Sequence, residues 1–91
     1  MLKTISIIVS GKVQGVFYRQ STKEKADELG IQGIVRNMPD ETVYIEATGN
    51  KEQLEKLKAW CHHGPRKAVV TGVQIKEIAL KDFSKFTIER H

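Results

Sequence analysis

Residues 11–19 read Gly11-Lys12-Val13-Gln14-Gly15-Val16-Phe17-Tyr18-Arg19, a loop bracketed by two glycines between an apolar segment and a predicted helix. Glycine lets the backbone turn sharply, so successive N–H groups can point into one concavity, the geometry of an anion nest. Arg19 adds a planar fork of donors with a fixed positive charge, and a helix N-terminus adds partial positive charge. The loop is therefore predicted to bind an anion the size of a phosphate group.

The segments around this loop predict alternating strands and helices. Apolar alternation predicts strands at residues 3–10, 31–38, 42–48 and 69–78, and a short last strand through residues 86–90. Ser21 to Glu24 have the spacing of a capping box, which predicts the start of the first helix. Thr22, Ala26 and Leu29 fall on one stripe of that helix, and Gly30 is predicted to end it.

The second helix is predicted to follow Asn50, which caps it with Gln53 at the third helical position, and to end at Gly64-Pro65. Its apolar stripe comprises Leu54, Leu57 and Cys61. Two right-handed βαβ crossovers interleaved around a central hairpin give a ferredoxin-like α+β sandwich. We expect one domain over residues 1–91, with an antiparallel sheet, both helices on one face and a short extra C-terminal edge strand.

Composition limits the class of protein and its surroundings. The chain has 15 Lys and Arg against 11 Asp and Glu, a formal charge of +4, with the lysines spread along the sequence. This spread favours solubility and general attraction of anions over nucleic-acid binding. Residues 1–9 are too short and too often interrupted by polar residues for a signal peptide or a membrane span, and Cys61 is the only cysteine. We therefore expect a cytoplasmic monomer with no membrane or nucleic-acid partner.

Common nucleotide and metal motifs are absent from the sequence. Gly11-Lys12 is followed by Val13, where a nucleoside triphosphate loop needs Ser or Thr as a magnesium ligand. The glycine spacing also fails the dinucleotide-binding fingerprint. His62 and His63 are adjacent, so they point to different sides of a helix, and no Cys or carboxylate completes a ligand set. We expect no metal and no organic cofactor.

Asn37, near the end of the second predicted strand, is the candidate for holding a water molecule beside the loop. An amide both donates and accepts hydrogen bonds, so it can orient a water, but it cannot remove the water's proton. A site without an evident general base or acid suits a leaving group that departs unaided. A carboxylate, whose acid has a pKa of about 4, is such a group. The residues thus favour hydrolysis of a mixed carboxylic-phosphoric anhydride, whose own phosphate oxygens take the proton.

The loop closely resembles the signature of the acylphosphatases, which reads Gly-x-Val-Gln-Gly-Val-x-Phe/Tyr-Arg. The resemblance covers almost the whole chain. Beyond the loop it includes Ala26 with Leu29-Gly30, Gly33-x-Val35-x-Asn37, Asp40, Val43, Gly49, Trp60, Gly64-Pro65-x-x-Ala68-x-Val70 and Phe86-x-Ile88-x-Arg90. It implies a free-standing enzyme that converts an acyl phosphate to a carboxylic acid and inorganic phosphate without a metal or cofactor.

The resemblance also implies residue roles. Arg19 would bind the phosphate, and Asn37 would position the attacking water. The phosphate oxygens would be wrapped by the N–H groups of Gly15, Val16, Phe17, Tyr18 and Arg19. Gln14 and Thr22 would support the loop.

One position departs from the family pattern. The family usually has Asp-Gly in the turn after the asparagine, whereas here Asp40 is followed by Glu41. If Glu41 keeps a left-handed backbone, the missing glycine costs on the order of 1 kcal/mol. If the turn changes type instead, Asn37 shifts and the rate of the reaction suffers.

Other interpretations of the same residues remain open. Arg19 alone is also typical of a surface arginine paired with a helix carboxylate, and Asn37 of a turn residue beside Pro39. On the same fold, a non-catalytic phosphate-binding or regulatory module would need the loop and Arg19 but neither Asn37 nor turnover. RNA binding on this fold uses stacked aromatic residues on the open face of the sheet, where the sequence offers only Tyr44.

Overall fold

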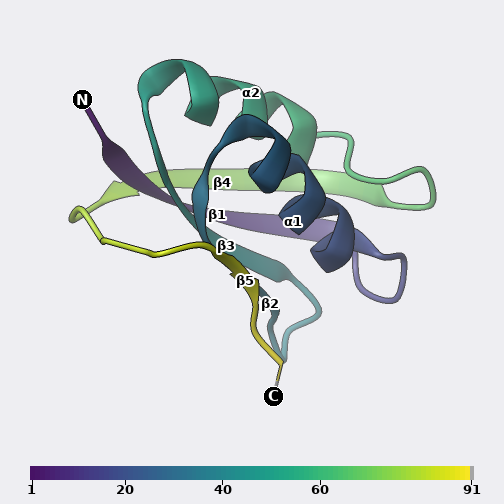
Figure 1. The fold of residues 1–91 in the computed structure, drawn as a ribbon. Helices are drawn as coiled ribbons and strands as arrows, with labels where there is room; N and C mark the ends of the chain where they lie inside the picture. The colour runs from purple at the N-terminus through teal and green to yellow at the C-terminus, as the bar shows by residue number, and fades with distance from the viewer. Residues whose placement is uncertain (91) are drawn as a thin grey trace.

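The computed structural model describes residues 1–90 and has the predicted order of elements (Figure 1). The elements are β1 (Lys3–Lys12), α1 (Tyr18–Leu29), β2 (Gln32–Asn37), β3 (Val43–Gly49), α2 (Lys51–Cys61), β4 (Val69–Ile78) and β5 (Phe86–Ile88). The strands form one sheet in the order β4-β1-β3-β2-β5. The first four strands pair antiparallel, as predicted, but the edge strand β5 runs parallel to β2, so the whole sheet is mixed.

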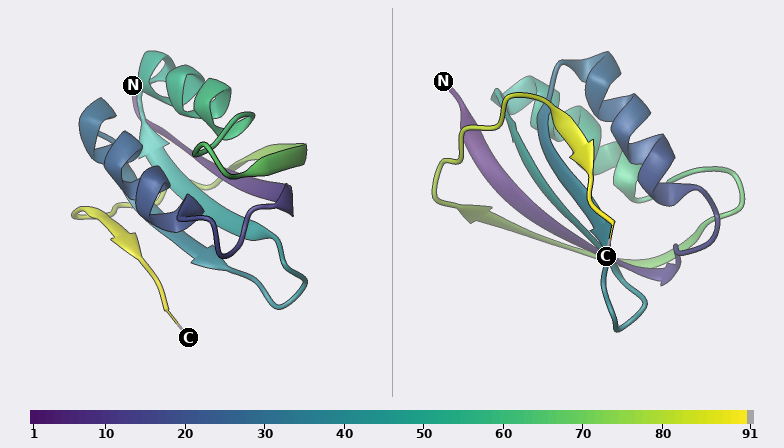
Figure 2. Two further views of the ribbon diagram at one scale, coloured as in Figure 1. Left: turned by 90° about the vertical axis from the view of Figure 1, so that its right-hand side faces the viewer. Right: turned by 60° about the horizontal axis from the view of Figure 1, so that its bottom comes forward.

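Both helices cover the same face of the sheet, as two views of the ribbon show (Figure 1, Figure 2). Alternate residues of the central strands point into the layer between sheet and helices, because successive side chains of a strand face opposite sides. The alternate apolar residues of β1 and β3 are buried in this layer: Ile5, Ile7, Val9, Val43, Ile45 and Ala47. Each large aliphatic side chain buried there stabilises the fold by about 1.5–3 kcal/mol.

The two helices differ in how well their starts could be predicted. Asn50 and Gln53 form the predicted capping box at the start of α2, with both hydrogen bonds at 2.8 Å. The predicted start of α1 is wrong, since the helix begins at Tyr18 and Ser21 already lies inside it. Phe17, in a left-handed conformation with φ of 64°, sets that start. Among residues 1–90, no helix is long and apolar enough to cross a membrane.

The path from β1 into the loop depends on Gly11. Its φ is +122°, and a Cβ atom there would clash with the carbonyl oxygen of Val69 in β4. The pairing of β1 with β4 shifts register between Ser10 and Gly11, which is the mark of a β-bulge. The bulge redirects the chain at the end of the sheet, so the loop lies beside the β2–β3 turn.

Candidate functional site

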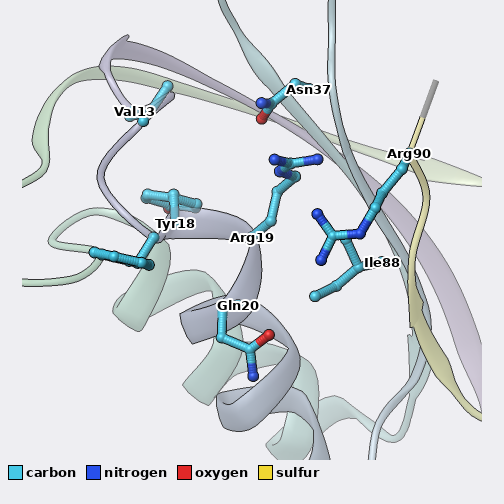
Figure 3. A pocket seen from close by; sticks show the side chains of 9 residues that line it. Val13, Tyr18, Arg19, Gln20, Asn37, Ile88 and Arg90 are labelled. Atoms are coloured by element: carbon cyan, nitrogen blue, oxygen red, sulfur yellow. The ribbon is translucent and has the colours of Figure 1, made fainter.

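The loop, the first turn of α1 and the end of β2 line one cavity of about 430 Å³ (Figure 3). The lining residues are Val13, Gly15, Phe17, Tyr18, Arg19, Gln20, Asn37, Ile88 and Arg90. The structure therefore brings Arg19 and Asn37 together, although they are 18 positions apart in the sequence. In Figure 3 the side chain of Asn37 points toward the guanidinium of Arg19.

The backbone of the loop offers a row of open donors. Within residues 1–90, the N–H groups of residues 15–19 donate no hydrogen bond to another backbone group, and the N–H of Ser21 is the first to bond back, to the carbonyl oxygen of Phe17 at 2.9 Å. Gly15 and Phe17 have positive φ values of 74° and 64°. Alternation of left-handed and right-handed residues turns successive N–H groups toward one side. The loop therefore has positive-φ residues where the glycine spacing predicts an anion nest, and it lies at a helix N-terminus.

Buried side chains fasten the loop to the core. Val13, Val16 and Tyr18 are each at most 5% exposed, so every second or third residue of the loop is an anchor. The hydroxyl of Tyr18 donates to the carbonyl oxygen of Cys61 at 2.8 Å, and burial raises the pKa of Tyr18 so that the donor stays protonated. Val16 thus lies beneath the loop and not in the cavity, while Phe17 is 76% exposed at the cavity's edge. The loop is held in place before any ligand arrives.

Thr22 and Gln14 do not line the cavity, but each makes hydrogen bonds to the backbone of a segment that does or that adjoins it. The Thr22 hydroxyl is buried and donates to the carbonyl oxygen of Tyr18 at 2.7 Å, one turn back along α1. The Gln14 side-chain nitrogen donates to the carbonyl oxygens of Met38 and Thr42, both at 2.9 Å. These two carbonyls belong to the β2–β3 turn that follows Asn37. Gln14 therefore connects the anion-binding loop to the segment that carries Asn37.

Asn37 carries the one buried side-chain polar atom of residues 1–90 that lacks a hydrogen-bond partner. Its Oδ1 atom is buried and has no hydrogen-bond partner among residues 1–90. Leaving a buried acceptor unpaired costs about 1–3 kcal/mol, so proteins rarely do so without a reason. The amide points into the cavity toward Arg19 (Figure 3), and an amide can both donate to and accept from a water molecule held there.

Positive charge dominates the cavity. No Asp, Glu or His is among the described lining residues, whereas Arg19 and Arg90 both are. Arg90 was not among the predicted site residues. Its only signal was the final Phe86-x-Ile88-x-Arg90 pattern, and the parallel pairing of β5 with β2 brings it into the cavity that Asn37 also lines. Residues 1–90 contain no group of three or more His, Cys, Asp or Glu side chains that could hold a metal ion.

The turn after Asn37 keeps a left-handed backbone conformation at Glu41, although this residue is not the glycine usual in the family. Glu41 has φ of 73°, and its N–H donates to the carbonyl oxygen of Met38 at 3.1 Å. Met38 in turn donates to the carbonyl oxygen of Thr42 at 2.9 Å, which closes the turn. The turn therefore has its hydrogen bonds, and Glu41 carries the conformational strain.

An α+β sandwich that places an open helix N-terminus, an arginine and an unpaired buried amide in one cavity defines a protein that handles phosphoryl groups. The comparisons with known proteins identify the family. The family model described as Acylphosphatase matches residues 5–88. An acylphosphatase of Marinobacter nauticus is 53% identical over 81 residues, which is 88% of each protein.

Solved structures agree with the sequence comparison. An acylphosphatase from Coxiella burnetii has a TM-score of 0.94 at 39% identity and covers 97% of this chain and 93% of its own. One from Bacillus subtilis has a TM-score of 0.94 at 32% identity and covers 99% of this chain and 100% of its own. The chain belongs to the acylphosphatase family. The ferredoxin-like fold expected from the sequence is confirmed.

Proposed function

We propose that the chain hydrolyses acyl phosphates with the loop and Arg19 holding the phosphate and Asn37 holding the attacking water. The observation that carries this proposal is the buried, unpaired Oδ1 of Asn37 in the same cavity as the open N–H groups and Arg19. A module that only bound phosphate would need the loop and the arginine. It would have no use for an orphaned acceptor, whose burial lowers stability.

In the proposed reaction, the phosphate group occupies the nest formed by the N–H groups of residues 15–19 and accepts hydrogen bonds from the Arg19 guanidinium. These donors stabilise the charge that spreads over the equatorial oxygens in the transition state. The water bound to Asn37 attacks phosphorus, and the bond from phosphorus to the acyl oxygen breaks. The bonding electrons leave with the carboxylate.

Proton transfer in this scheme needs no protein base. The described lining has none, and a carboxylate departs without protonation because its acid has a pKa of about 4. The proton of the attacking water passes to an oxygen of the substrate's own phosphate. The products are a carboxylate and protonated inorganic phosphate, so charge and atoms balance.

The remaining expectations belong to the same proposal. Gln14 keeps Asn37 in register with the loop through its two hydrogen bonds to the β2–β3 turn. Thr22 supports the first turn of α1 beneath Arg19. The enzyme acts without metal or cofactor, as a monomer in the cytoplasm.

Hydrolysis of acetyl phosphate by the purified chain, with and without a strong chelator, tests the proposal. We expect turnover that the chelator leaves unchanged and that inorganic phosphate inhibits competitively. Saturable phosphate binding without turnover would select the non-catalytic module instead. Turnover that chelator abolishes and added divalent metal restores would contradict the metal-free mechanism.

A further inference from the structure

Arg90 is a second arginine of the cavity, and the proposed mechanism gives it no task. It follows β5, and its side chain reaches the cavity that Arg19 and Asn37 line (Figure 3). Within residues 1–90, neither arginine is in an ion pair, whereas the preceding Glu89 pairs with Arg36 at 3.0 Å. The described part of the chain therefore brings two positive charges to one cavity and neutralises neither.

The position of Arg90 relative to Asn37 indicates which part of a substrate it meets. In Figure 3 the guanidinium of Arg19 lies between the Asn37 amide and the guanidinium of Arg90. In phosphoryl transfer, the attacking and leaving oxygens lie roughly in line on opposite sides of phosphorus. With the attacking water at Asn37, the acyl group points toward Arg90. This step rests on the proposed function.

The cavity has room for an acyl group as well as a phosphate. Its volume of about 430 Å³ lies in the range of pockets that hold small organic molecules. Phe17 and Ile88 supply apolar walls of the cavity, and Ile88 lies beside Arg90 in Figure 3. Arg90 itself is exposed, whereas Arg19 is half-buried at the start of α1. An exposed guanidinium at the mouth suits a charged group at the far end of an acyl chain, and its planar fork matches a carboxylate.

We propose that Arg90 determines substrate specificity by binding a carboxylate carried on the acyl part of the substrate. The enzyme then favours the monoacyl phosphates of dicarboxylic acids over those of monocarboxylic acids of similar size. Arg90 contributes to binding of the acyl group, so its removal raises KM and leaves kcat nearly unchanged.

A comparison of succinyl phosphate with acetyl phosphate tests this inference, with each rate corrected for spontaneous hydrolysis. We expect Arg90→Gln to lower kcat/KM for succinyl phosphate about fivefold to tenfold at low ionic strength and to change it less than twofold for acetyl phosphate. Arg66→Gln is the matched control, because Arg66 is an exposed arginine outside the cavity lining. Arg66→Gln removes the same charge and is expected to leave kcat/KM unchanged for both succinyl phosphate and acetyl phosphate.

Two results would overturn the inference. An equal loss on both substrates would mean that Arg90 acts on the phosphoryl group or the leaving oxygen that both share. No loss on either substrate would mean that Arg90 does not contact the substrate.

A binding experiment separates failure of this inference from failure of the proposed hydrolysis. The inert probes are 2-oxopropylphosphonate and 4-oxo-5-phosphonopentanoate, in which a methylene replaces the bridging oxygen and only the second carries a carboxylate. Calorimetry is expected to show that Arg90→Gln weakens the second probe about fivefold to tenfold and the first less than twofold. Equal effects on the two probes would contradict the role of Arg90 whether or not the wild-type chain turns over acetyl phosphate.

Discussion

The two helices of this protein begin in opposite ways. At the start of α2, Asn50 accepts from the N–H of Gln53, the Gln53 side chain bonds back, and Glu52 adds a negative charge to the first turn. At the start of α1, Phe17 makes no side-chain cap, and the first turn has no acidic residue. A helix N-terminus carries unpaired N–H groups and partial positive charge, which proteins normally satisfy. The helix beside the cavity is thus left open, while the helix away from it is closed.

The two asparagines repeat this difference. Asn50 uses its side-chain oxygen within the fold, at 2.8 Å from the N–H of Gln53. The side-chain oxygen of Asn37 is buried and unpaired within residues 1–90. The side-chain oxygen of Asn50 therefore stabilises the fold through a hydrogen bond, whereas that of Asn37 makes no such bond within residues 1–90. Unmet hydrogen bonds and strained backbone gather at the cavity, which is where a ligand would satisfy them.

Removal of Arg19 is expected to have the largest effect on activity. Arg19→Ala takes away the charged donor closest to the open helix start, and we expect kcat/KM for acetyl phosphate to fall by at least about a thousandfold, or about 4 kcal/mol. Steady-state kinetics measure this loss of activity, and inhibition by inorganic phosphate measures the accompanying loss of phosphate affinity. Arg19→Lys keeps the charge without the fork and is expected to recover only part of the activity. Full activity in the alanine variant would remove Arg19 from the site.

Substitution of the two asparagines tests the comparison from both sides. We expect Asn37→Ala to lower kcat by a factor that corresponds to a loss of about 3–4 kcal/mol of transition-state stabilisation. Inhibition by inorganic phosphate is expected to stay near normal, and the free energy of unfolding is expected to be unchanged or higher. Asn50→Ala is expected to lower the free energy of unfolding by about 1 kcal/mol and to leave kcat unchanged. Urea unfolding and steady-state kinetics on both variants check this. A similar loss of stability in the two variants would contradict the inference that the Asn37 side chain does not stabilise the fold.

Inorganic phosphate is expected to stabilise the protein by closing the start of α1. A ligand that binds only the folded state adds about 2.7 kcal/mol to the free energy of unfolding at a concentration of one hundred times its Kd. Thermal or urea unfolding over a phosphate series measures the gain. Sulfate-free buffer at constant ionic strength is the control, and Arg19→Ala is expected to abolish most of the gain while Asn50→Ala retains it. Equal stabilisation of the Arg19→Ala variant would indicate general ion effects and not binding in the cavity.

The contrast between the helix starts also explains what the sequence could and could not predict. The cap of α2 follows local rules, so Asn50 and Gln53 were identified correctly. The start of α1 was placed too late, at Ser21, because capping rules look for side chains that satisfy N–H groups and here none does. Within the described chain, the helix instead begins where Phe17 takes a left-handed conformation.

The assembly of the site depended on long-range pairing. Arg19 and Asn37 were found from the glycine loop and the family signature, and the structure places both in one cavity. Arg90 was missed because its approach depends on β5 pairing in parallel with β2, which no local pattern of three residues reveals. Likewise, the hydrogen bonds from Gln14 to the β2–β3 turn join positions 24 and 28 residues away.

The smallest predicted effect concerns the strained backbone near the cavity. Phe17 and Glu41 are the non-glycine residues with positive φ among residues 1–90, and Glu41 lies in the turn after Asn37. A left-handed conformation costs a residue with a Cβ about 1–2 kcal/mol. Glycine avoids this strain, but part of the gain is offset because glycine gives the unfolded chain more conformational entropy. We expect Glu41→Gly to raise the free energy of unfolding by up to about 1 kcal/mol, measured by urea unfolding, with kcat within twofold of wild type.

Glu41→Ala is the matched control for that substitution, since alanine removes the charge of Glu41 but keeps the Cβ and hence the strain. It is expected to leave the free energy of unfolding within about 0.5 kcal/mol of wild type. If alanine and glycine stabilise equally, the strain at Glu41 is not the cause and the charge is. If glycine stabilises the protein but lowers kcat, then the stiff turn at Glu41 is part of what holds Asn37 in place. The strain near the cavity would then serve the same end as the open start of α1.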